Sequence, residues 1–287
     1  MRMRRLALVA ALAALGVILL VPTAASAAQE YGSTSKWPWS GYWWPMKESG
    51  YNLYSNNGPL QKYDQFTSTL GQRTTAQAWE KANHYTTSAD NSWWGHCHAW
   101  AAASILAAEP TAVTRNGVSF SANDTKGLVT ALYYEPTFNW LSGNRVDDVN
   151  DKSSAAYKDI APAWMDYLLR YYVRKYRYPF IMDINADSQV WNYPVFAYQR
   201  SSSMAGSVET VTTTVWYSKP VWNATQTQYF SKTYTYRLQA GTLGEWTGSS
   251  VNDHPDFAWV PTGKRPGAGT NPQVSERTVE TITGLDA

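Results

Sequence analysis

One cysteine between two histidines, in a tryptophan-rich stretch, could supply a nucleophile. Cys97 is the only cysteine of the chain and lies within NSWWGHCHAW, residues 91–100. Residues 1–27 predict export, and an exported protein normally pairs its cysteines or has none. A turn-like WWG precedes Cys97, and an alanine-rich stretch follows as far as Pro110, which predicts a helix that begins near the thiol. The N–H groups and dipole at that helix end favour the nucleophilic thiolate. The alternative for Cys97 is a small buried hydrophobe.

A thiolate nucleophile needs a base, a group that orients the base and a donor for the oxyanion. Of the four histidines, His254 is the predicted base, because it lies far downstream at the start of a predicted strand. His84 lies upstream. His96 and His98 flank the cysteine, and adjacent residues on a helix or strand point apart.

The third member of the triad is left open. Asp256 shares a strand face with His254, and Asn271 follows at a spacing that fits a papain-like asparagine, so these two rank first. Asp183 and Asn185, on an earlier predicted strand, are the alternatives.

The oxyanion donors are predicted to be the Asn91 side chain and the backbone N–H of Cys97. Papain-like enzymes carry a Gln and a Gly where this chain has Asn91 and Gly95. The alternative for Asn91 is a turn or cap residue.

A metal site at residues 96–98 is not expected. His96, Cys97 and His98 are adjacent, and structural zinc sites space their ligands by two residues or more. The chain also has no Cys-x-x-Cys and no His-Glu-x-x-His motif. We therefore expect that the chemistry requires no cofactor, and the sequence leaves calcium dependence open.

Residues 1–27 have the features of a signal peptide. Three arginines precede an apolar run over 6–21, and Ala25-Ser26-Ala27 forms a small-residue cleavage site. The segment holds three arginines and no acid, so the net charge of +2 becomes −1 without it. This balance gives no electrostatic reason to expect nucleic acid or an anionic membrane as partner. We expect a secreted monomer that has no contact with a membrane once the signal peptide is cleaved.

The order of the predicted elements indicates an α+β fold. Helical patterns come first, and strand patterns rich in β-branched and aromatic residues follow. Asn123 or Asp124 is the expected cap of the fourth helix. Three segments are expected: the signal peptide 1–27, an irregular tryptophan-rich arm 28–58 and a single catalytic domain 59–287. The predicted helices cover 60–70, 74–85, 99–108, 123–134 and 153–177, and the strands 180–184, 190–199, 208–218, 229–239 and 257–260.

Three segments together resemble the transglutaminase elicitor family, known from secreted oomycete enzymes. They are CHAWA at 97–101 after WWG, VWNYPV at 190–195 and HPDFAW at 254–259. The second resembles the Val-Trp-Asn-Gln-Pro-Val core of a surface peptide that plants recognise, with Tyr193 in place of Gln. The resemblance implies a papain-like or transglutaminase-like aminoacyltransferase that acts on protein-bound Gln and Lys.

In that chemistry Cys97 attacks a glutamine carboxamide, ammonia leaves, and a lysine amine resolves the thioester while His254 moves the protons. Aromatic walls that exclude water favour transfer over hydrolysis. Two other functions remain open: a cysteine peptidase or amidase, and a non-catalytic cell-wall-binding protein that uses the tryptophan-rich arm. The expected wall residues are Trp93, Trp94, Trp100 and Trp259, with core packing as the alternative for each.

Overall fold

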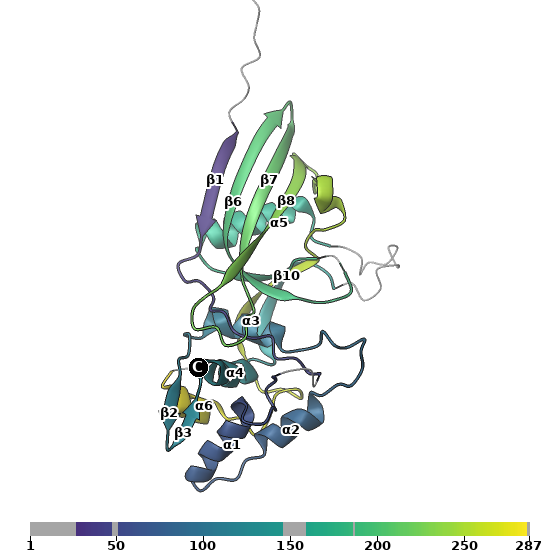
Figure 1. The fold of residues 1–287 in the computed structure, drawn as a ribbon. Helices are drawn as coiled ribbons and strands as arrows, with labels where there is room; N and C mark the ends of the chain where they lie inside the picture. The colour runs from purple at the N-terminus through teal and green to yellow at the C-terminus, as the bar shows by residue number, and fades with distance from the viewer. Residues whose placement is uncertain (1–26, 48–50, 146–158, 186, 286–287) are drawn as a thin grey trace, which may run out of the picture.

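The computed structural model describes residues 27–47, 51–145, 159–185 and 187–285. Within these ranges the chain has an α+β fold with one large antiparallel sheet, as expected from the order of its elements (Figure 1). Most of the predicted signal peptide and the start of the predicted 153–177 helix lie outside the described residues. No helix in the described ranges is long and apolar enough to cross a membrane.

The sheet has the strand order β4-β10-β5-β6-β7-β8-β9, and β1 also pairs with β6. All of these pairings are antiparallel. Strand β5 pairs with the first residues of β6, and β1 pairs with the stretch that follows. The strands are β1 (Ala28–Ser33), β4 (Pro136–Gly143), β5 (Phe180–Asp183), β6 (Asn192–Ala205), β7 (Val208–Ser218), β8 (Tyr229–Gln239), β9 (Glu245–Trp246) and β10 (Phe257–Lys264).

Most helices gather at one end of the molecule, below the sheet in Figure 1, and α3 lies between this group and the sheet. A small hairpin of β2 (Val113–Arg115) and β3 (Val118–Phe120) flanks the helical group. The helices are α1 (Pro59–Thr69), α2 (Ala76–Asn83), α3 (Cys97–Leu106), α4 (Ala122–Leu132), α5 (Pro162–Leu168), the π-helix η1 (Leu169–Lys175), the 3₁₀-helix η2 (Gly248–Val251) and α6 (Glu276–Thr283).

Two apolar clusters form the core. One joins α3 to the other helices of the lower group, and the second fills the space between the sheet and α5. Helix α3 is rich in alanine and is buried along nearly its whole length. Small side chains allow the neighbouring helices and strands to approach it closely, and that packing determines where Cys97 lies.

The tryptophan-rich arm is part of the core. Trp39 and Trp44 are buried in the helical cluster. The buried ammonium of Lys126 on α4 donates to the Ser40 carbonyl at 2.6 Å and to Glu109 at 2.7 Å. The arm begins with strand β1, which was not predicted, and these two tryptophans pack into the helical cluster.

Several local expectations need correction. Helix α4 is capped by Ser121, whose hydroxyl accepts from the Asp124 N–H in a capping box, and not by Asn123 or Asp124. The cysteine helix begins at Cys97, two residues earlier than predicted. The long helix begins with Pro162 in its first turn, as its pattern indicated, but continues as a π-helix. Strands β1 and β4 and helix α6 were missed.

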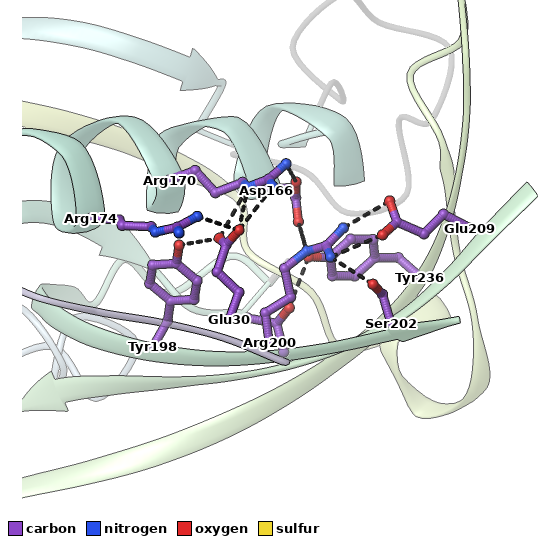
Figure 2. Close-up of polar contacts among 10 residues, drawn as sticks. Glu30, Asp166, Arg170, Arg174, Tyr198, Arg200, Ser202, Glu209 and Tyr236 are labelled. Carbon is purple, nitrogen blue, oxygen red and sulfur yellow. Dashed lines mark hydrogen bonds and ion pairs between the residues drawn. The ribbon is translucent and has the colours of Figure 1, made fainter. Parts of the chain in front are cut away.

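A polar network holds β1 and the helix α5–η1 against the sheet (Figure 2). Glu30 of β1 accepts from Arg170 and Arg174 of η1. Next to it, buried Asp166 of α5 accepts from Arg200 at 2.6 Å and from the Tyr236 hydroxyl at 2.7 Å. These contacts join residues that are far apart in sequence in a chain that has no disulfide.

Replacing Asp166 tests this network. Asp166→Ala is expected to lower the free energy of unfolding by about 3–5 kcal/mol, because the buried Arg200 guanidinium loses its closest anionic partner. Urea unfolding measures the change. The control Glu245→Ala breaks the exposed Arg237–Glu245 pair and should cost less than about 1 kcal/mol. Equal effects of the two substitutions would contradict the prediction.

Candidate active site

The thiol of Cys97 lies at the first residue of α3, at the wall of a cavity of about 370 Å³. The Cys97 side chain is buried, with 8% of the residue exposed. Trp93, Trp94 and His98 line the same cavity. This is the helix N-terminus that the sequence predicted, and it gives the thiol an approach route for a substrate.

The turn before Cys97 depends on Gly95. A Cβ at this position would lie 2.6 Å from the Trp43 ring and 2.7 Å from the Trp43 carbonyl oxygen. The neighbouring His96 N–H donates to the same carbonyl at 2.7 Å. Only a residue without a side chain allows the arm to pack this closely against the start of α3.

Asn192, the first residue of β6, is the side chain that contacts the sulfur. Its Nδ2 donates to Cys97 Sγ at 3.6 Å, and its Oδ1 accepts from the Trp259 indole at 2.7 Å. An indole N–H only donates, so this bond fixes the amide with its NH₂ group toward the thiol. The sequence analysis gave Asn192 no role, although it lies in the VWNYPV segment that carries part of the family resemblance.

The structure does not show the depressed thiol pKa expected from the helix N-terminus alone. Burial raises the pKa of Cys97 above its ordinary value, and the charge of Asp183 acts in the same direction. Hydrogen bonds from the backbone and side chain of Asn192 and from the His98 backbone oppose this rise in pKa. The resting group is therefore a thiol, and a base must remove its proton.

Two buried carboxyl groups, Asp183 at the end of β5 and Asp256 directly before β10, act on each other. Both side chains are fully buried, and the Asp256 N–H donates to the Asp183 carbonyl at 3.1 Å. Burial first, and then the charge of Asp256, raise the pKa of Asp183 well above its ordinary value. The charge of Asp183 acts on the thiol, but no bond from Asp183 to a histidine is seen among the described residues. Asp256 does not orient His254, whose two ring nitrogens bond to Ser250 and Asp159.

His254 is not positioned to act on Cys97. Its Nδ1 bonds to the Ser250 carbonyl and its Nε2 to Asp159, each at 2.9 Å. The ring stacks on Trp246 with 5.3 Å between centroids. Both ring nitrogens are therefore used away from the thiol, and the structure does not support the sequence-based assignment of His254 as the base.

His98 is the histidine that shares the cavity with Cys97. Its Nε2 lies 2.9 Å from the Tyr134 carbonyl, which can only accept, so Nε2 carries the hydrogen and Nδ1 holds the lone pair. Burial lowers the pKa of His98, which keeps the ring neutral. Although adjacent helix residues point apart, the side chains of Cys97 and His98 both line this cavity.

The three asparagines of the sequence analysis lie elsewhere. Asn271 donates to Ala76 O at 2.9 Å and to Glu80 at 3.0 Å, and Asn185 accepts from Lys232 at 2.6 Å. Asn91 is not among the residues that line the cavity; its carbonyl accepts from the Trp94 N–H at 3.0 Å. This geometry gives Asn91 the alternative role of a turn residue.

A smaller apolar cavity of about 220 Å³ adjoins the first and shares His98 and Asn192 with it. Phe138, Trp140 and Trp259 line this second space. Of the tryptophans expected as walls, Trp93 and Trp94 line the first cavity and Trp259 the second. Trp100 is fully buried and bonds to the Trp39 carbonyl, so it belongs to the core.

These features define an α+β protein whose single thiol lies at the first residue of a buried helix. A model of the transglutaminase elicitor family matches residues 67–234, more than half of the chain. The chain belongs to the transglutaminase elicitor family. The crystal structure of the GP42 transglutaminase from Phytophthora sojae has a similar fold, with a TM-score of 0.69 and 21% sequence identity, over 88% of this chain and 90% of that one. No curated protein matches the chain.

The contact between Asn192 and the thiol predicts how fast Cys97 reacts. Asn192→Ala is expected to slow alkylation of Cys97 by iodoacetamide about tenfold at pH 7 and to move the midpoint of the pH–rate profile upward. The reason is that the thiolate loses a hydrogen bond, and one to a charged group is worth about 1.5–3 kcal/mol. Asn185→Ala is the matched control and should leave the midpoint unchanged. An unchanged midpoint in Asn192→Ala would show that the amide does not stabilise the thiolate.

Proposed function

We propose that the protein is a secreted protein-glutamine γ-glutamyltransferase whose nucleophile is Cys97. The observation that carries the proposal is the shared cavity: it holds the only thiol, an amide that donates to its sulfur and a neutral histidine. The family and the fold support the same reaction class. Export rests on the signal-peptide features of residues 1–27.

In the first half of the reaction, His98 Nδ1 accepts the thiol proton as Cys97 Sγ attacks the carboxamide carbon of a glutamine side chain. The carbonyl oxygen becomes an oxyanion, and the Asn192 side-chain amide, which donates to the sulfur, can stabilise it. Transfer of the proton from His98 to the nitrogen releases ammonia and leaves a thioester on Cys97.

In the second half, a lysine amine attacks the thioester carbon and passes its proton to His98. The C–S bond breaks, the proton returns to the sulfur, and an isopeptide product leaves. The aromatic residues of the two adjoining cavities limit the access of water, which would compete as acceptor. A lysine has an apolar stem, which suits the apolar second cavity.

The peptidase or amidase alternative uses the same thioester with water as the acceptor. The non-catalytic alternative could use only part of the arm, because Trp39 and Trp44 are buried whereas Trp37 is exposed. Two expectations stay predictions: that the protein is a monomer, and that its chemistry needs no cofactor.

Removing the thiol is the first test. Cys97→Ala is expected to abolish incorporation of a fluorescent primary amine into a glutamine-donor protein, because no thioester can form, while circular dichroism stays unchanged. Ammonia release by the unaltered protein, measured with and without the amine, separates transfer from hydrolysis. Amine incorporation by the folded variant would refute the assignment of Cys97.

The identity of the base is tested by a pair of histidine variants. His98→Gln is expected to lower kcat by about 10²–10⁴-fold with little change in KM, because a glutamine can still donate to Tyr134 O but cannot accept the thiol proton. His254→Gln should keep kcat within a few-fold. Because burial lowers the pKa of His98, the unaltered enzyme should lose activity only below about pH 6.5. A large loss in His254→Gln alone would restore the downstream histidine as the base.

A further inference from the structure

A second cluster of ionisable side chains lies beside the thiol but does not open on its cavity. Glu80 of α2, His84 at the C-cap of α2 and His96, directly before α3, are all buried. One potential ligand atom from each lies within 4.8 Å of those from the other two. Sequence spacing did not reveal this set, because His84 and His96 come from different elements.

All the contacts in this cluster converge on one carboxylate. Glu80 Oε1 lies 2.7 Å from His84 Nδ1 and 3.3 Å from His96 Nε2, and Oε2 accepts from Asn271 at 3.0 Å. Two imidazoles therefore share one oxygen, and the contact to His96 is long. His96 Nδ1 has no hydrogen-bond partner among the described residues, although it is buried.

The charge of this carboxylate needs a counterpart. Within the described residues, the basic side chains found beside Glu80 are those of His84 and His96. A buried carboxylate is costly without a cation beside it. A bound metal ion would supply that cation.

The geometry points to a binding site for one divalent transition-metal ion of the Zn²⁺ class at Glu80, His84 and His96. Two imidazoles and a carboxylate are ligands that Zn²⁺ accepts at about 2.0–2.2 Å, whereas Ca²⁺ takes six to eight oxygens. The ion would take the place of the hydrogen that His84 Nδ1 now shares with Glu80 Oε1, at a contact of 2.7 Å. Asn271 donates to Glu80 Oε2 and would thereby orient the carboxylate so that Oε1 faces the ion.

The consequence of such an ion would be structural. His96 is the N-cap of α3, and its backbone N–H already bonds to the arm. An ion would fasten α2, the following loop and the residue before Cys97 to one another. It would thus supply a crosslink to an exported chain that has no disulfide.

The test measures metal binding and does not depend on enzyme activity. Chelator-treated mature protein with Cys97→Ser, which removes the thiol as a ligand, is titrated with ZnCl₂ by calorimetry and with CoCl₂ by visible absorption. We expect one ion per chain and a higher Tm with zinc. The Glu80→Gln and His84→Ala variants should lose binding, and His254→Ala, which removes a histidine outside the cluster, should keep it.

Asn271→Ala provides a variant that keeps all three ligands, and its affinity should fall by about 10–100-fold. Absence of stoichiometric binding by the folded protein would overturn the site, even if the ligand variants fail to fold. So would binding that survives His84→Ala but disappears in His254→Ala. If only the protein with an intact Cys97 binds zinc, the ion belongs to the thiol and the proposed site is wrong.

Discussion

Helix α3 is enclosed on all sides, and the arrangement of the remaining structure follows from that constraint. It packs against α4 on the helical side and against β5, β6 and β10 of the sheet. A helix in this position can bring its neighbours close only if its side chains are small, which accounts for the run of alanines after Trp100. The first residues of such a helix need hydrogen-bond partners at the boundary between the two apolar clusters. Cys97 lies at that boundary, where strand ends from the sheet supply Asn192 and Asp183.

Much of the architecture could be predicted from the sequence, because it depends on local pattern. The β-branched and aromatic runs predicted strands β7 and β8. The turn before an alanine-rich stretch predicted that the thiol lies at the start of a helix. The missed elements have local reasons: β1 lies in a segment dominated by Gly, Ser and Trp, and β4 contains polar residues on an exposed edge. The cap of α4 was misplaced because Asp124 is the third residue of the helix and completes a capping box with Ser121, which is the N-cap.

The partners of the thiol could not be predicted in the same way. Spacing suggested that His254 would reach Cys97, but Asp159 and the Ser250 carbonyl bond to its ring. No local sequence pattern predicts such bonds. The same limit applies to Asn192, whose role depends on an indole from another strand. The sequence could indicate which residue types take part, while the direction of each side chain is a property of the packed tertiary structure.

Strand β1 has a consequence for the order in which the chain folds. Its partner on β6 lies far downstream, and the side chains of Gln29 and Ser201 that bond across this pair are 172 positions apart. Contacts of such separation form only after a large loop has closed, and they slow folding. The first strand to emerge during synthesis is therefore among the last to find its place. During synthesis β1 therefore stays without its partner until the chain has extended through β6, which ends at Ala205.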